Sequence, residues 1–448
     1  MINKNKKNIL YTCLILLFLS FTFQGTPPKG WYLQTVDLQG RQINDIVFFD
    51  SLTGLMMAVN TSITDSSCIF KTTNGGDNWF LLSNINIFTG GLQFLNENTG
   101  YAYGGFVFKT TNQGINWVQI NLPEGGANGF YALNEDTIWI ASGVDLVGGL
   151  YRTTNGGQNW IRQFYITGSG NPDRVYFVNK DLGFISYNGG PLRRTTNGGF
   201  NWSLISGETY WVDIHFENDT VGWKSRGDLK KTINGGLTWQ VINLPQGGIS
   251  INGGILSSNT GIYEFSFVNK DTIWGSGSRI FYGSGRNRGL LYISTNQGET
   301  WGYQLPDTGY QIIQYFQLDF TNKLNGWAYP DNQNKGVHTV TGGDSIRIIT
   351  DISTISTEIP ERFELYQNYP NPFNPVTKIK FSLKESKSNI KILVYDVNGK
   401  LIETLLNSEF SPGTYEVTFD GSKFSSGVYF YTLETENLKE TKKMLLLK

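Results

Sequence analysis

The sequence predicts an all-β protein, in which a seven-bladed β-propeller is followed by a small antiparallel β-sandwich. The first observation is composition: 53 of 448 residues are glycine, 14% are aromatic and only 16% are charged, where ~25% charged is typical. The second is a turn motif ending in tryptophan that recurs six times at roughly 40-residue spacing. The third is an apolar strand pattern that recurs seven times between those turns. Short strands joined by tight turns have this composition.

The N-terminus predicts a signal peptide over residues 1–25. Lys4, Lys6 and Lys7 precede an apolar run over 9–23, which is short for a bilayer span. An uncleaved anchor is the alternative. Cleavage leaves Cys68 as the one cysteine, so no intrachain disulfide is expected.

The turn motif reads T/S-x-N-x-G-x-N/T-W, as in KTTNGGDNW at 71–79. Asparagine tolerates the left-handed region and bonds its own following backbone, glycine adopts positive φ without a steric cost, and tryptophan buries a large face. We therefore interpret these residues as structural. They are Asn74, Gly76, Trp79, Asn112, Gly114, Trp117, Asn155, Gly157, Trp160, Asn197, Gly199, Trp202, Asn234, Gly236, Trp239, Asn296, Gly298 and Trp301.

Each unit reads as strand, polar turn, strand, loop, strand, NGG turn and strand. Four short strands per repeat, repeated seven times, are typical of a β-propeller. The last unit has a degenerate turn, VHTVTGGDS at 337–345, which lacks the tryptophan. The segment WYLQTV at 31–36 has the pattern of an outer strand, but the other three strands of its blade are missing. We expect these two segments to pair and close the ring over residues 26–350, because an open sheet edge invites aggregation.

The turn motif resembles the Asp-box (BNR) repeat, and more closely its variant in propellers of the photosystem II assembly-factor type. The resemblance covers roughly residues 30–350 and implies the fold. Asparagine stands where many Asp-boxes have aspartate, which argues against a metal site in the box.

A polar segment at 351–360 is predicted to be a linker to a domain at 361–448. An Asn-Gly hairpin turn at 398–399 and the alternating strand SGVYFY at 426–431 predict an antiparallel β-sandwich. The pieces YPNPFNP, VYDVNGK, SSGVYFYTL and KKMLLLK resemble the C-terminal sorting domain of the type IX secretion system. That resemblance implies the secretion machinery as a partner and a secreted or cell-surface product. It also implies that the domain is removed on export, with the product released or attached to surface lipopolysaccharide. An accessory domain without a sorting role is the alternative.

The formal charge of −1 argues against nucleic-acid partners. No catalytic constellation is recognised, and two isolated histidines and one mature cysteine give no metal cluster; we expect no metal and no cofactor. We favour a non-enzymatic protein that binds a protein or glycan. The alternative is a secreted glycoside hydrolase, sialidase-like or acting on polysaccharides. Sialidases bind the substrate carboxylate with three arginines; Arg226, Arg279 and Arg286 are candidate cleft residues, but their contexts do not match the family's arginine motifs. For a hydrolase with two carboxylates, Asp213, Glu217 and Asp319 are the candidate acids.

A ligand face is expected at the mouth of the central channel, on the loops between units. Aromatic rings stack on sugars and anchor protein partners. Tyr210, Trp211, Tyr310, Tyr315 and Arg226 are the predicted ligand-binding residues.

Overall fold

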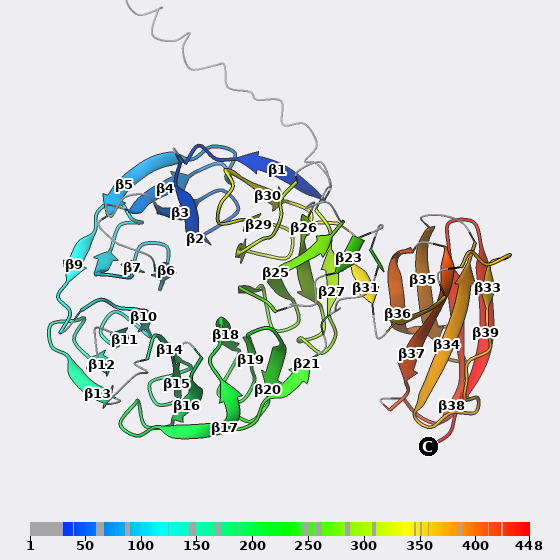
Figure 1. The fold of residues 1–448 in the computed structure, drawn as a ribbon. Helices are drawn as coiled ribbons and strands as arrows, with labels where there is room; N and C mark the ends of the chain where they lie inside the picture. The colour runs from blue at the N-terminus through cyan, green and yellow to red at the C-terminus, as the bar shows by residue number, and fades with distance from the viewer. Residues whose placement is uncertain are drawn as a thin grey trace, which may run out of the picture.

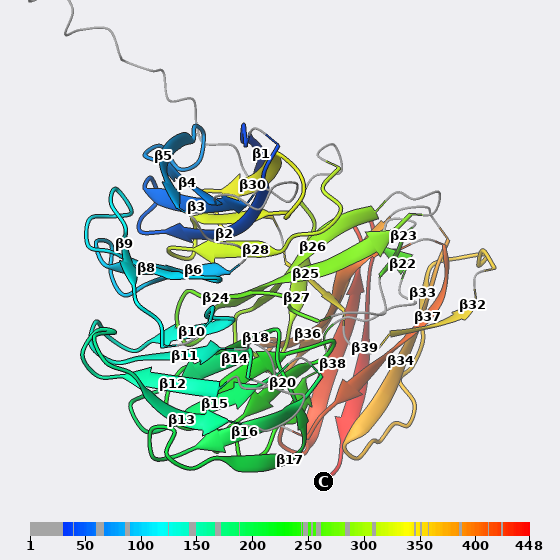
Figure 2. The ribbon, with the colours of Figure 1, turned by 60° about the vertical axis from the view of Figure 1, so that its left-hand side comes forward.

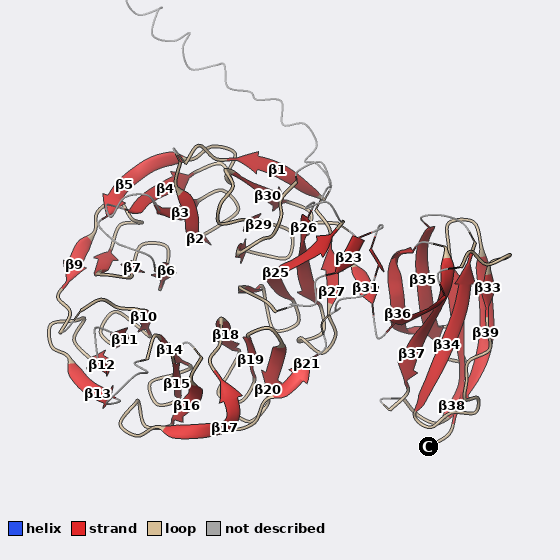
Figure 3. Ribbon diagram, viewed as in Figure 1, coloured by secondary structure: helices blue, strands red, loops and turns tan. Residues whose placement is uncertain are grey.

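The computed structural model describes residues 30–448 except 39, 60–66, 86–89, 124, 143–148, 166–171, 188, 243, 245–249, 252–253, 257–260, 283–286, 307–310, 345, 350–351, 357, 385–387, 411 and 423. The predicted signal peptide lies outside these residues. Every regular element among them is a β-strand (Figure 3). Across the same residues, no helix has the length and apolar character needed to cross a membrane.

Seven antiparallel sheets follow one another along the described chain. Blade 1 is β2 (Gln42–Phe48), β3 (Gly54–Val59), β4 (Ser67–Thr72) and β5 (Phe80–Ile85). Blade 2 is β6 (Gly91–Phe94), β7 (Gly100–Tyr103), β8 (Val107–Thr110) and β9 (Val118–Ile120). Blade 3 is β10 (Gly129–Ala132), β11 (Ile138–Ser142), β12 (Gly149–Thr153) and β13 (Ile161–Tyr165). Blade 4 is β14 (Arg174–Phe177), β15 (Gly183–Ser186), β16 (Pro191–Thr195) and β17 (Ser203–Thr209).

The remaining blades complete the ring. Blade 5 is β18 (Asp213–Phe216), β19 (Gly222–Ser225), β20 (Leu229–Thr232) and β21 (Gln240–Ile242). Blade 6 is β24 (Phe265–Phe267), β25 (Ile273–Phe281), β26 (Asn287–Ser294) and β27 (Gly302–Gln304), with a hairpin of β22 (Ser250–Ile251) and β23 (Gly254–Leu256) on the extension of β25. Blade 7 is β28 (Gln317–Phe320), β29 (Gly326–Tyr329), β30 (Lys335–Thr339) and the N-terminal β1 (Trp31–Thr35).

The blades surround one axis, with the first strand of each unit innermost (Figure 1). The all-β propeller predicted from the repeats is confirmed. The long sixth repeat also has its explanation, because the extra residues form the β22–β23 hairpin and lengthen β25 and β26.

The predicted ring closure is also confirmed. β1 pairs antiparallel with β30, so Trp31 lies opposite Thr339. The backbone N–H of Gly343 donates to Thr339 Oγ1, as the N–H of Gly76 donates to Thr72 Oγ1 in blade 1. Trp31 therefore occupies the tryptophan position that the degenerate turn of blade 7 lacks. The N-terminus supplies both the missing strand and the missing side chain.

The turn motif has the same hydrogen bonds in all six copies, and blade 1 is representative. Thr72 Oγ1 donates to Asn74 Oδ1 at 3.0 Å, and Asn74 Oδ1 also accepts the backbone N–H of Asn78 at 3.0 Å. The fourth and fifth motif positions both have positive φ, with values of 69° and 89° at Gly75 and Gly76. Gln113 keeps a φ of 55° at the fourth position. A left-handed non-glycine residue is unfavourable, so the surrounding hydrogen bonds must hold the turn there.

In blades 3, 5, 6 and 7 a tryptophan of the second strand packs against a ring of the next blade. Trp327 on β29 stacks on Phe48 of β2 with ring centroids 3.5 Å apart. Trp139 on β11 stacks in the same way on Phe177 of β14, at 3.6 Å. These indoles are completely buried. The turn tryptophan Trp79 meets two rings edge-on, Phe48 of its own blade and Tyr329 of blade 7, so it also packs between blades.

The C-terminal region is a β-sandwich of two antiparallel sheets. One sheet contains β36 (Leu401–Phe410), β35 (Ser388–Tyr395), β38 (Gly427–Glu434) and β39 (Lys439–Leu446). The other contains β32 (Ile352–Ser356), β37 (Gly413–Asp420), β34 (Val376–Leu383) and β33 (Glu364–Leu365). The predicted linker at 351–360 is wrong in part, because residues 352–356 form β32 and pair with β37. Their alternating Ile, Ser and Thr residues suit a strand despite the polar composition.

The sandwich is not a separate appendage. β31 (Arg347–Ile349) pairs with β27 of blade 6 on one side and with β36 of the sandwich on the other. One sheet thus runs from blade 6 into the sandwich, and the sandwich stands beside that blade (Figures 1 and 2).

Candidate functional site

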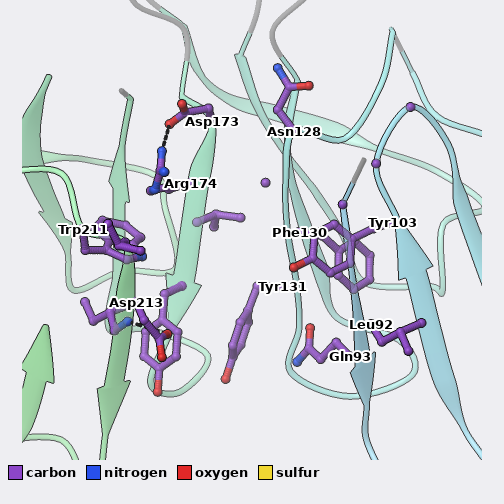
Figure 4. Close-up of a pocket in the computed structure, with 18 residues that line it drawn as sticks. Leu92, Gln93, Tyr103, Asn128, Phe130, Tyr131, Asp173, Arg174, Trp211 and Asp213 are labelled. Carbon is purple, nitrogen blue, oxygen red and sulfur yellow. Dashed lines mark hydrogen bonds and ion pairs between the residues drawn. The ribbon is translucent and has the colours of Figure 1, made fainter. Parts of the chain in front are cut away.

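A cavity of about 810 Å³ opens where blades 2 to 5 meet at one end of the ring. Its walls come from the residues that begin the inner strands β10, β14 and β18 and from those that end β7. In Figure 4, Trp211 and the Asp173–Arg174 pair face Tyr103 and Phe130 across the cavity. This is the face on which the sequence analysis placed a ligand.

Glycine brings the loops around this cavity close together. A Cβ atom at Gly129 would lie 2.7 Å from the carbonyl oxygen of Asp173, and one at Gly126 would lie 3.0 Å from Cα of Gly105. A larger residue at either position would push the neighbouring loop away. The backbone itself therefore forms part of the lining.

Aromatic rings form the deeper wall. Tyr103 and Phe130 stack with centroids 5.1 Å apart and planes 15° apart. Tyr131 and Tyr176 approach at 5.1 Å with a tilt of 59°. Burial raises the pKa of Tyr131 to about 12, so its hydroxyl stays protonated at neutral pH and is able to donate a hydrogen bond. Such a wall combines apolar ring faces with hydroxyl edges.

Two arginines flank Tyr210 at the rim. Arg226 lies over the ring at 4.0 Å and Arg174 at 5.1 Å from its centroid. Arg174 also forms an ion pair with Asp173 at 3.1 Å. Cation–π contacts of this kind orient guanidinium groups, so the rim carries ordered positive charge beside the aromatic wall.

Three of the five predicted ligand-binding residues lie at or beside the cavity, one is buried elsewhere, and one is outside the described residues. Trp211 lines the cavity although it is only 4% exposed, and Tyr210 and exposed Arg226 lie next to it. Tyr315 is a correction: it is 2% exposed and packs in the core between blades 6 and 7, where its ring lies against Gly289. Tyr310 lies outside the described residues.

Sequence reasoning missed several lining residues, including Tyr103, Phe130, Tyr131, Asp173 and Arg174. They come from three repeats: Tyr103 ends β7, Phe130 and Tyr131 lie in β10, and Asp173 and Arg174 are at the start of β14. The available signal was Asp173-Arg174 immediately before the strand pattern of the fourth unit, a charged pair in a charge-poor chain.

Carboxyl groups on or beside the inner strands connect the blades. Asp45 of blade 1 accepts the backbone N–H of Leu92 in blade 2 at 2.6 Å and that of Ile46 at 2.8 Å. Asp213 of blade 5 repeats this pattern with Phe265 of blade 6 and with Ile214, both at 2.7 Å. Both oxygens of each group are thus engaged. Asp319 accepts the N–H of Phe48 and so connects blade 7 to blade 1.

Burial dominates the electrostatics of these groups. It raises the pKa of Asp45 to about 7 and the pKa values of Asp213 and Asp319 to about 6, against the opposing effect of the backbone hydrogen bonds. Burial, followed by the charges of Asp45 and Asp213, also raises the pKa of Glu264. Proton uptake by the folded ring is therefore expected close to neutral pH.

The Asp45→Asn variant tests this electrostatic arrangement. A raised pKa means that the folded state binds more protons than the unfolded state between pH 4 and 7, so stability falls as pH rises through this range. From pH 6 to 8 the native protein should lose about 1 kcal/mol of unfolding free energy relative to Asp45→Asn. His215 and His338, whose pKa values burial lowers to about 4, contribute equally to both proteins. Urea unfolding at several pH values measures the difference, and parallel pH profiles would contradict the shift.

Two of the candidate acids, Asp213 and Glu217, lie apart along the chain. Asp213 begins β18 and Glu217 follows its end, so about 13 Å of extended chain separates them. Arg279 lies over Phe281 of its own strand, and Arg286 is outside the described residues. Among the described residues, no group of three or more His, Cys, Asp or Glu side chains is arranged to hold a metal ion.

The comparisons identify the C-terminal domain. Residues 367–447 match the family of secretion system C-terminal sorting domains. The chain is therefore exported by the type IX system to the cell surface or the medium. No curated protein matches the chain.

Several solved structures are similar to it. A structure of YCF48 bound to a D1 peptide is 17% identical, with a TM-score of 0.48, and the match covers 70% of this chain and 100% of that one. YCF48 from Cyanidioschyzon merolae is 18% identical, with a TM-score of 0.49, over 69% of this chain and 98% of that one. PorZ, a surface component of the type IX secretion system of Porphyromonas gingivalis, is 11% identical, with a TM-score of 0.21, over 91% and 81% of the two chains.

Proposed function

We propose that the propeller is a non-catalytic binding module that recognises a protein or glycan in the cavity between blades 2 and 5. A signal peptide at 1–25 takes the chain across the inner membrane. The sorting domain directs it through the type IX apparatus and is cut from the propeller on export. The turn copies act as an Asp-box-like structural repeat and take no part in binding.

The composition of the cavity carries this proposal. Its wall offers stacked rings at Tyr103 and Phe130, the amide of Asn128 and backbone from several glycines. Its carboxyl groups are already used: Asp173 pairs with Arg174, and both oxygens of Asp213 accept backbone N–H groups. A glycosidase needs two available carboxyl groups across a cleft. Ring faces with a few polar groups are what a sugar or peptide ligand needs.

The test is a combined binding and hydrolysis screen of the full chain on an array of surface glycans and extracted surface proteins. Asn128→Ala and Arg174→Ala should each weaken the binding that the parent shows by about tenfold. Val118→Ala is the matched control, because Val118 is 70% exposed on the outer strand of blade 2. Binding that survives both cavity variants would contradict this site. Product release that Asp213→Asn abolishes would favour the hydrolase.

A further inference from the structure

The outer strand of blade 6 differs from the outer strands of blades 1 to 5. The second residue after the turn tryptophan is Leu81, Leu204 and Val241 in blades 1, 4 and 5, with exposed fractions of 47%, 55% and 57%. In blade 6 the same position is Tyr303, which is completely buried. The outer strand is therefore covered at blade 6, whereas it is exposed to solvent at the other blades compared.

The cover begins with β31. Tyr303 lies opposite Arg347 and Gly302 opposite Ile348, while Ile348 lies opposite Asn407 of β36. The Nδ2 of Asn407 donates to the carbonyl oxygen of Ile346 at 2.8 Å. β31 therefore uses one edge for the propeller and the other for the sandwich, which is how an exposed outer strand is normally extended.

Apolar packing follows the same path. One cluster of buried side chains joins the rim of blade 6 to the interior of the sandwich. It includes Trp301, Tyr303 and Leu305 from the blade and Ile392, Leu406 and Tyr431 from the sandwich. Such a joint core costs free energy to separate, because apolar surface on both sides would meet water.

We infer that the rim of blade 6 is a docking surface for the sorting domain of this same chain, and that the domain stays bound after the connection between them is cut. Residues 350–351 join β31 to β32, so a cut there leaves β31 on the propeller and the whole sandwich on the other fragment. Hydrolysis of one such peptide bond consumes one water and leaves a carboxylate on the propeller fragment and an amine on the sandwich fragment. It breaks none of the contacts of β31 with β36.

Two consequences follow. Cutting the chain and releasing the sorting domain are separate steps, since release also requires β36 to leave β31. The cut does remove the covalent tether, and with it the high effective concentration that the tether provides. The affinity of the docking surface alone then decides whether the propeller carries the domain.

The experiment uses the full chain with a protease recognition sequence in place of Thr350 and Asp351. After complete cleavage, verified on a denaturing gel, size-exclusion chromatography at micromolar concentration reports whether the fragments travel together. A single peak that contains both fragments is expected. Two peaks from this parent protein would overturn the inference.

Paired variants locate the surface. The position of Tyr303 in blade 6 is occupied by Arg162 in blade 3, so Tyr303→Arg introduces a residue that another blade already has there. After cleavage, this variant should separate into two peaks. Val241→Arg at the same position of blade 5 should leave one peak. Asn407→Ala, on the sandwich side, should weaken association about fivefold and reports on the interface even if Tyr303→Arg does not fold. Co-elution unchanged by both Tyr303→Arg and Asn407→Ala would overturn the assignment to this surface.

Discussion

Replacing Trp31 with alanine is expected to lower the free energy of unfolding by about 3–5 kcal/mol, because a large buried side chain is lost and a cavity remains. Trp31 is 4% exposed, and its Nε1 donates to Gln304 Oε1 of blade 6 at 2.7 Å. Its ring meets Trp274 and Phe320 edge-on, each at 5.9 Å. One side chain therefore fastens the closing strand of blade 7 to its own blade and to blade 6.

Leu33→Ala is the matched control for this variant. Leu33 lies two residues along the same strand and is 39% exposed, so its truncation should change stability by less than about 0.5 kcal/mol. Urea denaturation of both variants measures the difference. Equal unfolding midpoints for the two variants would mean that β1 does not hold the ring closed. In that case, deletion of residues 26–40 should also leave the stability unchanged.

Glu208→Ala is expected to cost about 3–5 kcal/mol, since it leaves the buried Lys224 ammonium without its counter-charge. Glu208 Oε2 lies 2.9 Å from Lys224 Nζ and 3.0 Å from Lys230 Nζ. The side chains of Glu208 and Lys224 are 10% and 5% exposed. Burial lowers the pKa of Lys224, and Glu208 opposes that shift. Without the glutamate, both the desolvation of Lys224 and its repulsion by Lys230 remain.

Glu135→Ala supplies the control for this second prediction. The Lys109–Glu135 pair has a similar length, 2.8 Å, but Glu135 is 53% exposed, and solvent-exposed pairs contribute about 0–1 kcal/mol. Thermal or urea unfolding of the two variants compares a buried and an exposed ion pair in one protein. A loss below 1 kcal/mol for Glu208→Ala would show that water reaches the Lys224 ammonium.

The Glu208 cluster also supports the candidate site. Lys224 Nζ donates to the carbonyl oxygen of Thr209, and Arg226 Nη1 donates to Thr209 Oγ1. Thr209 ends β17 immediately before Tyr210 and Trp211. The buried charges therefore hold the strand end from which the rim of the cavity begins. We expect Glu208→Ala to weaken ligand binding together with stability, whereas Asn128→Ala changes binding alone.

The sequence determined the architecture because its signals are local and repeated. A turn such as residues 72–78 needs only its own hydroxyl, amide and glycine to form, and six copies reveal the period. The closing strand was predictable because WYLQTV had no blade and the seventh unit had no outer strand. The sorting domain was recognisable from contiguous motifs.

Only the tertiary structure decided which residues share a surface. The cavity collects short runs of residues from strand ends of four repeats, including Tyr103 and Trp211. Apart from the charged Asp173-Arg174 pair, the chain carries no signal that these strand ends lie together. Tyr315 looked like Tyr210 in sequence, yet it lies inside the core. The joint between blade 6 and the sandwich depends on β31, three residues whose polar neighbours predict a linker. The hydrogen bonds of a turn join residues close together in the sequence, so the sequence predicts them. Burial and docking depend on contacts between residues far apart in the chain.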